Sequence, residues 1–431
     1  MKLRLLAAAA LVALAVPAGA DASDVGRRFA PEKKIAIDRV TGHPIVLLTS
    51  GATSDAKNYP THPQWAADGV HIVFRSSDRA ASGTAQAFAV NEITGDIVQL
   101  TDGPGTGTGS LNLARKSNKL YYMRRTAQDA PAQLIEVDLT PLLADAAAGT
   151  PRPQGYERVV ATMPKDHIEA GGFTLDGDEK TAYVGFDQRR APPRQPGGPV
   201  PQVPGGLRAI DLVTGKVRTV ITVPFRMGHV QANPFVPGEI LYCHETGGDA
   251  PQRMWIVKGD GTGNRPVYKE GPTDWVTHEQ FADADHVIFN LMGHKSDLRK
   301  APTGILVVNL RDDTVEHLGQ IPIREFRRTE LANFPDPNIP QDRTSTGGYW
   351  HNGVTYDGRW AAGDDFDGNV WLIDRKTNKR TLLTSGHRMR PDHAHPSFSP
   401  DGKRILVQTG MLADGKKLAL AVVPVAPAAE D

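Results

Sequence analysis

Three histidines in the last part of the chain could hold a metal ion. His393 and His395 lie two residues apart, and in an extended chain side chains at that spacing point to the same side. His351 stands just before the Asp357-Gly358 turn, as His393 and His395 stand before a later Asp-Gly turn. If the two turns belong to equivalent repeats, the three imidazoles can converge on one ion. A His-x-His pair alone is weak evidence, and the third histidine strengthens the hypothesis.

A second group of residues suited to acid–base chemistry lies between residues 225 and 281. A His-Glu pair occurs twice, at His244-Glu245 and at His278-Glu279, and His229 precedes both. Histidine changes charge near neutral pH, so a positioned imidazole can take up a proton. These histidines could instead be structural residues beside buried aromatic side chains, and the sequence leaves that alternative open. Three further histidines have charged neighbours and are expected at the surface: His71, His286 and His317.

The elements that must position these residues follow a repeating pattern of turns and strands. One unit is an aromatic or apolar residue, an Asp-Gly turn and an apolar strand. Three copies are clear: Trp65–Gly69, Phe173–Gly177 and Phe398–Gly402. A fourth copy has the Asp357-Gly358 turn after Val354. Three more copies, near Leu111, Phe235 and Phe281, have lost the Asp-Gly turn and keep only the strand. A second unit, an apolar strand followed by a Thr-Gly type turn, occurs at Asp38–Gly42, Asn91–Gly95, Asp211–Gly215 and Asp374–Asn378. Glycine accepts the positive φ of tight hairpin loops, so both units predict antiparallel strands.

Seven copies of the first unit, at a mean spacing of roughly 55 residues, predict an all-β fold, a seven-bladed β-propeller. The propeller is expected to span about residues 35–425, and a β-sandwich with repetitive turns is the alternative. Two stretches interrupt the repeats. Ala191–Gly206 is rich in proline and glycine and is predicted to be a solvated loop, and Ile321–Gly348 is a longer insertion. Gly103–Gly109 has the composition of a phosphate-binding loop, but no helix is expected after it, so we interpret it as an ordinary loop.

The composition excludes several classes of partner. The 431 residues carry 49 basic and 49 acidic side chains, which gives no general attraction for nucleic acid or an anionic membrane. Cys243 is the single cysteine, so the fold depends on its core and not on an intramolecular disulfide.

The N-terminal residues predict export. Lys2 and Arg4 precede an apolar run that ends near Ala18-Gly19-Ala20, the pattern of a cleaved signal peptide over residues 1–20. We expect residues 21–34 to form an N-terminal extension and the mature protein to be periplasmic or secreted. No later segment is apolar enough to be expected in a membrane, and the sequence does not indicate an oligomeric state.

Several spaced motifs occur in one order along the chain: Gly228-His229, Cys243–Glu245, Arg253–Trp255, Thr277–Glu279, His351 before Asp357-Gly358, and His393–Phe398. This set resembles the oligogalacturonate lyases, from about Asp38 to the C-terminus. The resemblance implies a seven-bladed propeller that cleaves short oligogalacturonides by β-elimination, with a manganese ion, to give 4,5-unsaturated uronates.

The resemblance also implies roles for particular residues. His278 corresponds to the proposed base and Arg253 to the arginine beside the substrate carboxylate. The metal ligands correspond to His351, His393 and His395. His229 and His244, which belong to the same ordered set, are expected to contact the acidic oligosaccharide.

One position departs from the pattern of that family. The family's fourth protein ligand is a glutamine three residues before the first histidine of the pair, where this chain has Arg390. A guanidinium has no acceptor lone pair and cannot ligate a cation. Water or substrate could complete the shell, Asp392 could do so, or Arg390 could bind a substrate carboxylate in a bidentate pair.

A different class of function remains as the alternative. Non-catalytic periplasmic propellers of the Tol-system type, which act as binding or scaffold proteins, share the Ser-Pro-Asp-Gly turns. The arrangement of histidines and Arg253 separates the two hypotheses, because a scaffold has no need to assemble it.

Overall fold

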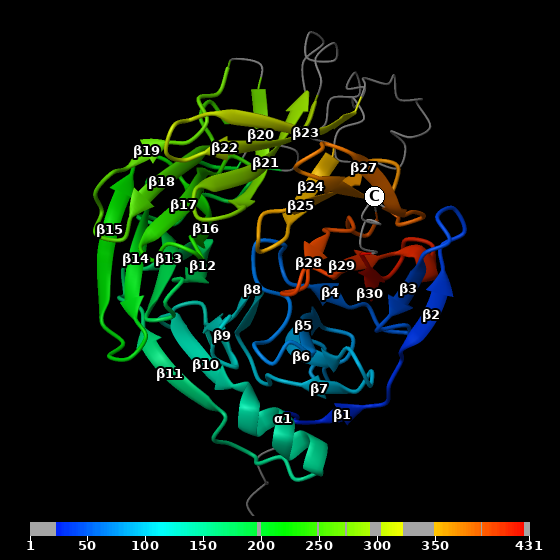
Figure 1. Cartoon of the computed structure of the whole chain (residues 1–431). Coiled ribbons are helices and arrows are strands. Elements are labelled where there is room, and N and C mark those ends of the chain that lie inside the picture. The colour runs from blue at the N-terminus through cyan, green and yellow to red at the C-terminus, as the bar shows by residue number, and fades with distance from the viewer. Residues whose placement is uncertain are drawn as a thin grey trace, which may run out of the picture.

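The computed structural model describes residues 23–195, 200–247, 250–271, 274–293, 303–321, 349–388 and 390–425. Seven antiparallel sheets form a ring around one axis (Figure 1), which confirms the seven-bladed β-propeller predicted from the repeats. The predicted signal segment, residues 1–20, lies outside the described residues, as do residues 322–348 of the predicted insertion. Among the described helices, none is long and apolar enough to cross a bilayer.

The first four blades follow one another along the chain. Blade 1 contains β4 (Ala56–Lys57), β5 (His71–Ser76), β6 (Gln86–Asn91) and β7 (Ile97–Gln99), with β1 (Arg28–Phe29) at its edge. Blade 2 contains β8 (Thr106–Leu113), β9 (Lys119–Arg124), β10 (Gln133–Asp138) and β11 (Glu157–Thr162). Blade 3 contains β12 (Ile168–Leu175), β13 (Thr181–Asp187), β14 (Gly205–Asp211) and β15 (Val217–Val223). Blade 4 contains β16 (Met227–Ala232), β17 (Glu239–His244), β18 (Met254–Lys258) and β19 (Arg265–Pro266).

The last three blades complete the ring. Blade 5 contains β20 (Asp274–Phe281), β21 (His286–Gly293), β22 (Thr303–Asn309) and β23 (Val315–Ile321). Blade 6 contains β24 (Tyr349–Val354), β25 (Trp360–Asp365), β26 (Val370–Asp374) and β27 (Arg380–Thr384). Blade 7 contains β28 (Ser397–Phe398), β29 (Arg404–Thr409) and β30 (Ala419–Pro424), joined by β2 (Lys34–Ile37) and β3 (Pro44–Leu47). We call β4, β8, β12, β16, β20, β24 and β28 the axial strands, because each is the edge strand of its sheet on the side of the ring axis (Figure 1).

The hairpin turns explain why the repeats are visible in the sequence. Gly95 and Gly215 close two of the Thr-Gly turns with φ values of 83° and 71°. In the turn between β14 and β15, Asp211 Oδ1 accepts the backbone N–H groups of Val213 and Thr214 at 3.0 and 2.7 Å. A short polar side chain followed by glycine therefore fixes each turn, and the strands on either side must pair.

One helix, α1 (Leu139–Ala148), was not expected from the repeats. It begins after Asp138, whose side chain accepts a hydrogen bond from the N–H of Thr140, and it ends at Gly149 with a φ of 73°. Both ends follow the usual capping chemistry of helices. The buried side chains of α1, which join the core between blades 1 and 2, are Leu139, Leu142, Leu143 and Ala146.

The ring closes by pairing the two ends of the chain (Figure 1). In blade 7, β3 pairs with β30, with Val46 opposite Val422. The residues expected to form an N-terminal extension also take part, since β1 pairs with β7 and Arg28 lies opposite Val98. Residues 28–29 therefore belong to the propeller fold itself.

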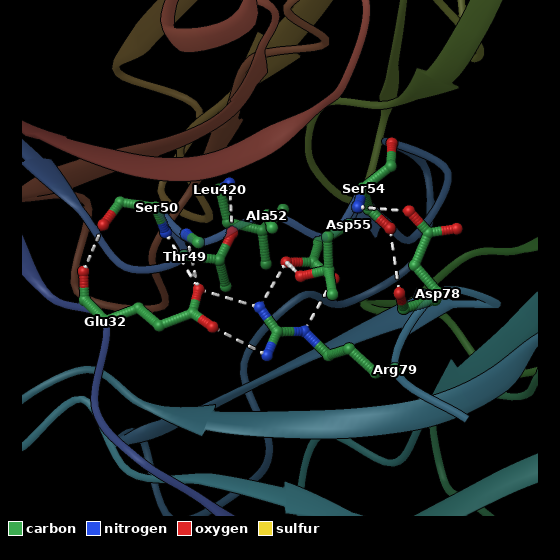
Figure 2. Close-up of polar contacts among 12 residues, drawn as sticks. Glu32, Thr49, Ser50, Ala52, Ser54, Asp55, Asp78, Arg79 and Leu420 are labelled. Atoms are coloured by element: carbon green, nitrogen blue, oxygen red, sulfur yellow. Dashed lines mark hydrogen bonds and ion pairs between the residues drawn. The ribbon is translucent and has the colours of Figure 1, made fainter. Parts of the chain in front are cut away.

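A buried ion-pair network fastens the closing segment to blade 1 (Figure 2). The Arg79 guanidinium donates to both carboxylate oxygens of Asp55 at 2.8 and 2.7 Å and to both of Glu32 at 3.0 and 2.9 Å. Glu32 also accepts the backbone N–H groups of Ser50 and Gly51 at 3.0 and 2.9 Å. Burial acts to raise the pKa of Glu32, but these bonds outweigh it and lower the pKa. Because Ser50 follows β3 and Arg79 follows β5, the network ties blade 7 to blade 1.

The stretch between β13 and β14 was expected to be a solvated loop, and its described ends are partly packed. The N–H of Gln188 donates to the carbonyl oxygen of Pro204 at 2.8 Å, and the N–H of Val200 to that of Thr246 at 3.1 Å. Val203 is buried. The end of this stretch therefore lies against the chain that follows β17 in blade 4.

Candidate active site and metal centre

Four of the predicted residues form a histidine cluster. The ring centroids of His351 and His395 are 3.8 Å apart, those of His351 and His278 are 4.2 Å apart, and those of His351 and His393 are 5.3 Å apart. His278 and His351 lie on the axial strands β20 and β24, and the other two precede the axial strand β28. The structure therefore brings these residues together from three consecutive blades.

The histidines occupy irregular positions of the backbone. The pairing of β20 with β21 shifts register between Thr277 and Gln280, and His278 at this bulge has a φ of 55°. His229 lies at the corresponding bulge of β16 with a φ of 47°, and His395 has a φ of 51°. A positive φ is uncommon for a residue with a Cβ, persists only where the surroundings enforce it, and is enriched at functional sites. The fold thus holds three site histidines in conformations that a regular strand would not give.

Amide side chains of neighbouring axial strands support these bulges. Asn352 Nδ2 donates to the carbonyl oxygen of His278 at 2.6 Å, and Gln280 Nε2 donates to the carbonyl oxygen of Asn352 at 2.9 Å. In the same way, Gln231 Nε2 donates to the carbonyl oxygen of Glu279 at 2.7 Å. Each bond crosses from one blade to the next, so the backbone around His278 is fixed by three blades.

Asp364, a buried carboxylate on β25, orients two cluster residues. Its oxygens lie 3.1 and 3.2 Å from Nδ1 of His351, and they accept the backbone N–H of His351 at 2.6 Å and of His395 at 3.1 Å. A proton on Nδ1 of His351 satisfies this contact and leaves the lone pair on Nε2, as in many metal-bound histidines. The possible ligand atoms of His351, Asp364 and His393 all lie within 4.8 Å of one another.

Burial keeps the cluster uncharged. The pKa values of His278, His351 and His395 are lowered well below the usual range, first by desolvation and then by neighbouring imidazoles and cations. Neutral imidazole is the form that binds metal ions, and several of them beside a carboxylate suit a divalent cation. The residues present therefore fit a metal centre. Among the described residues, Nδ1 of His278 has no hydrogen-bond partner, so this ring can still accept a proton.

Lys57, at the end of axial strand β4, anchors the chain beside the cluster. Its Nζ donates to the carbonyl oxygen of His395 and to Oγ of Ser397, both at 2.6 Å. Desolvation lowers the pKa of Lys57 to about 7, against the attraction of Asp364 and Asp392. Blade 1 thus holds the strained backbone of His395, which belongs to the entry of blade 7.

Arg253 and Glu279 form a buried ion pair next to the cluster. Arg253 Nε donates to Glu279 Oε2 at 2.9 Å, and the two side chains are 5% and 0% exposed. Glu279 Oε1 lies 3.5 Å from Nδ1 of His229, whose Nε2 lies 3.7 Å from Glu245. Burial acts to lower the pKa of Arg253, but the acidic groups around it raise the pKa well above its usual range. Since Nε bonds to Glu279, the two terminal nitrogens of Arg253 can receive a further carboxylate.

A second candidate ligand group fits a metal ion less well. The possible ligand atoms of His229, Cys243 and Glu245 lie within 4.8 Å of one another. Burial raises the pKa of Cys243 well above its usual range, which disfavours the thiolate that a metal ion binds. The charge of Arg253 also disfavours a cation here. The histidine cluster is therefore the better candidate metal centre.

His244 lies apart from the other predicted residues. Its ring stacks on Phe225 with centroids 4.3 Å apart, and its Nε2 lies 3.2 Å from Oε1 of Gln202. Side chains alternate along a strand, so His244 points to the opposite face of β17 from Cys243. His229, by contrast, lies within the Arg253 group described above.

Asp392, an alternative for the missing fourth ligand, and Arg390, the alternative binder of a substrate carboxylate, both lie beside the cluster. Asp392 Oδ1 is 3.5 Å from Nε2 of His395, and its Oδ2 accepts a hydrogen bond from Gln408 at 2.9 Å. Arg390 is exposed. Its charge helps to lower the pKa of His393, which desolvation lowers first. Asp392 is close enough to a predicted ligand to join a metal centre, whereas Arg390 can only attract an anion.

Sequence patterns did not indicate Asp364, Lys57 or Trp350. Buried charged residues within strands have no local signature, so the first two could not have been found. Trp350 adjoins His351, and its ring centroid lies 5.1 Å from that of His278 and 5.5 Å from that of His393. Trp350 could have been singled out from the sequence, because it is an aromatic residue next to a candidate metal ligand and aromatic rings offer rigid contact area to a bound molecule.

The fold and the site together define a seven-bladed β-propeller with a candidate metal centre and a buried Arg–Glu pair on its axial strands. The oligogalacturonide lyase of Pectobacterium atrosepticum is 25% identical to this chain over 425 residues, which cover 90% of this chain and 95% of the relative. The oligogalacturonate lyase of Dickeya dadantii is 25% identical over 415 residues, with the same coverage. These similarities confirm the resemblance that the motifs predicted, and no family model matches the chain.

Solved structures show the same fold. An oligogalacturonate lyase in complex with manganese superposes with a TM-score of 0.71 at 20% identity, covering 93% of this chain and 98% of that chain. An oligogalacturonate lyase from Vibrio parahaemolyticus superposes with a TM-score of 0.72 at 17% identity and the same coverage.

Proposed function

We propose that this protein is a lyase that cleaves short oligogalacturonides by β-elimination and uses a divalent cation, manganese. The observation that carries the proposal is the position of His278, whose ring centroid lies 4.2 Å from that of His351 and whose pKa is lowered in part by Arg253. A base, a carboxylate anchor and a cation site thus lie together. The relatives named as lyases, and the neighbour that contains manganese, support the same function.

His278 is the proposed base. The proton at C5 of a uronate is difficult to remove because the electron pair that remains develops negative charge beside a carboxylate. The neutral, half-buried imidazole of His278 can take this proton and become imidazolium. The C5–H electron pair then forms the C4–C5 double bond, the C4–O bond breaks, and the leaving oxygen takes a proton from water. The product is the unsaturated uronate.

Arg253 is the proposed anchor for the substrate carboxylate. Its pairing with Glu279 fixes the guanidinium and leaves the terminal nitrogens for a bidentate contact. His351, His393 and His395 would hold the cation, which when bound stabilises the charge that develops on the carboxylate. Asp364 and Lys57 act by positioning His351 and His395.

We also propose that the chain is exported. The support is the charged N-terminus, the apolar run and the Ala18-Gly19-Ala20 site within residues 1–20. N-terminal sequencing of protein from the periplasmic fraction is expected to begin near Asp21. Full-length protein recovered only from the cytoplasm would contradict this proposal.

The function is tested by the ultraviolet absorbance of new C4–C5 double bonds. Metal-free and manganese-loaded protein are each mixed with oligomers of galacturonate, mannuronate and glucuronate. We expect absorbance to rise with galacturonate oligomers when manganese is present, and to stay flat after chelation. If the metal-loaded protein forms no double bonds from any of these oligomers, the proposal fails and the non-catalytic binding propeller becomes the better hypothesis.

A further inference from the structure

A cavity of about 870 Å³ opens between blades 2 and 3. Its volume falls within the roughly 300–1,000 Å³ that is usual for ligand pockets. The lining comes from the start of β8, the turn after β9, the start of β12 and the chain that follows β13. The cavity has no part in the chemistry described so far.

The cavity adjoins the Arg253 group. Gly171 and Gly172 on β12 line it. A Cβ placed on Gly171 would lie 2.7 Å from the carbonyl oxygen of Met227 and 3.4 Å from Cα of Gly228. Gly228 directly precedes His229, so the lining of the cavity is in van der Waals contact with the backbone that carries a site histidine.

The axial strands differ in the residues that occupy their β-bulges. Blades 4 and 5 place His229 and His278 there, both at positive φ. Blade 3 places Gly171 and Gly172 in its bulge, with φ values of 72° and 75°. Blades 4 and 5 therefore present imidazoles at these positions, whereas blade 3 presents no side chain there, and a Cβ placed on Gly172 would meet open space, with no heavy atom within 4 Å.

Blade 2 extends this open space. The stretch Gly103–Gly109 was interpreted from the sequence as a loop, but axial strand β8 starts within it, at Thr106. A Cβ placed on Gly109, which lines the cavity, would have no neighbouring heavy atom within 4 Å. A larger side chain at this position would therefore project into the cavity.

The charged groups of the lining suit an acidic sugar. Arg125, Lys165 and Arg190 oppose Asp129 and Glu169, so the positive groups outnumber the negative ones. Lys165 and Arg190 are exposed. Within the described ranges neither of them lies in an ion pair, so both can meet the carboxylates of a ligand.

We infer that this cavity extends the substrate site and binds additional uronate residues of an oligogalacturonide, beyond the two that flank the cleaved bond. The inference rests on the proposed function, because it places the bond at His278 and the rest of the chain against blades 2 and 3. Glycines let the sugar rings approach the backbone, and Lys165 and Arg190 bind their carboxylates. Longer substrates therefore gain contacts that a dimer cannot make.

The test compares digalacturonate with tetragalacturonate as substrates. The variant Lys165→Gln/Arg190→Gln removes the two exposed cations, and Gly109→Leu fills the cavity without changing charge. The matched control Lys180→Gln/Lys216→Gln removes two exposed cations from turns at the other end of blade 3. Metal content and melting temperature establish that each variant is folded.

We expect kcat/KM of the wild type to be higher for the tetramer than for the dimer. Each cavity variant is expected to lose about tenfold on the tetramer, as for loss of a charge-assisted contact, and little on the dimer, while the control keeps both values. An unchanged preference for the tetramer in both cavity variants, or an equal loss on both substrates, overturns the inference.

A binding measurement separates this inference from the proposed function. Tetragalacturonate is titrated calorimetrically into wild type and the cavity variants. If tetragalacturonate binding depends on Lys165 and Arg190 but the protein forms no double bonds, the inference about the cavity is supported and the proposed lyase activity is refuted. If the protein forms double bonds but both cavity variants bind tetragalacturonate as tightly as the wild type, the proposed lyase activity is supported and the inference about the cavity is refuted.

Discussion

His278 is half-buried, its pKa is lowered well below the usual range by desolvation, and it has one ring nitrogen without a hydrogen-bond partner among the described residues. If it is the base, His278→Ala should lower the elimination rate by about 10²- to 10⁴-fold. Bound manganese should be retained, because the proposed ligands are other residues. Double-bond formation, metal content and melting temperature are measured on the same preparation, with His317→Ala, a change at an exposed histidine of β23, as the control. A folded, metal-loaded variant that eliminates at near the wild-type rate would remove His278 from the mechanism.

Asp364 is proposed to position two metal ligands, and this role can be tested by measuring metal binding without measuring the reaction. Asp364→Asn replaces an acceptor that both His351 and His395 contact, and loss of such a partner typically weakens metal binding by about 10- to 100-fold. A competition titration with a fluorescent chelator measures the manganese affinity of the purified protein.

The neighbouring residue supplies the control for that variant. Asp365 is also buried, but its carboxylate accepts hydrogen bonds from Trp371 and Asn369 on the following strand and turn. Asp365→Asn should therefore lower stability without changing manganese affinity. Equal affinities in the Asp364 and Asp365 variants would show that Asp364 does not orient the ligands.

The residues of the candidate site that could be predicted are those whose types and order along the chain form a recognisable pattern. His278, His351, His393 and His395 were found because several histidines in one order are an uncommon pattern, and the fold brings all four together. Asp364 was not found, because its contact depends on the pairing of β24 with β25. His244 was expected with the others, but strand alternation turns it to the opposite face of β17.

Among the elements, the hairpin turns were the features from which most of the strands could be predicted. Asp-Gly and Thr-Gly pairs require particular backbone conformations, so the sequence around Gly95 or Gly215 restricts the fold locally. The bulges at His229 and His278 could not be foreseen, since they need support from amides on other blades. The helix α1 was missed although Asp138 and Gly149 stand at its two ends, because neither residue differs from those in the hairpin turns.

The ion-pair network around Arg79 gives a prediction for the closing elements (Figure 2). The side chains of Arg79 and Asp55 are 2% and 1% exposed, so removing the cation leaves a buried carboxylate without its partner. Arg79→Met should therefore lower the free energy of unfolding by about 3–5 kcal/mol. Urea denaturation followed by tryptophan fluorescence measures the change.

Two further variants show whether burial is the cause. Arg28→Met removes an ion pair with Asp96 whose side chains are 46% and 34% exposed, and it should cost at most about 1 kcal/mol. The double variant Arg79→Met/Asp55→Asn should recover part of the loss, because the uncompensated charge is gone. A single Arg79 variant as stable as the wild type would mean that the network does not hold the ring closed.

For the whole molecule, buried histidines predict acid sensitivity. Burial is the chief cause that lowers the pKa values of His62, His167 and His387 to about 4, whereas an unfolded chain titrates near about 6.5. Between these values the unfolded state binds more protons than the folded state, so stability is lost as the pH falls from about 6.5 toward 4. The urea midpoint should decrease steadily over this range.

A histidine variant isolates this effect. His387→Gln should flatten the pH dependence between pH 6.5 and 4.5 by removing one buried titrating ring, whereas His317→Gln, at an exposed position, should leave it unchanged. The folded pKa of Glu136 is about 2, so the loss of stability that it causes begins near the unfolded carboxylate pKa and extends below this range. A urea midpoint that is constant from pH 6.5 to 4.5 would contradict the prediction.

The pairing of β3 with β30 determines when the ring that carries the proposed metal centre can close. The first strands of the chain leave the ribosome early, yet in blade 7 the hairpin of β2 and β3 cannot join the rest of the sheet until β30 has been made. The segment with His393 and His395 also belongs to this final stretch. A nascent chain can therefore build several blades and still lack the proposed metal centre. Translation that stops before β30 would release an open ring without a metal centre held in place, so incomplete copies of this protein should be catalytically silent.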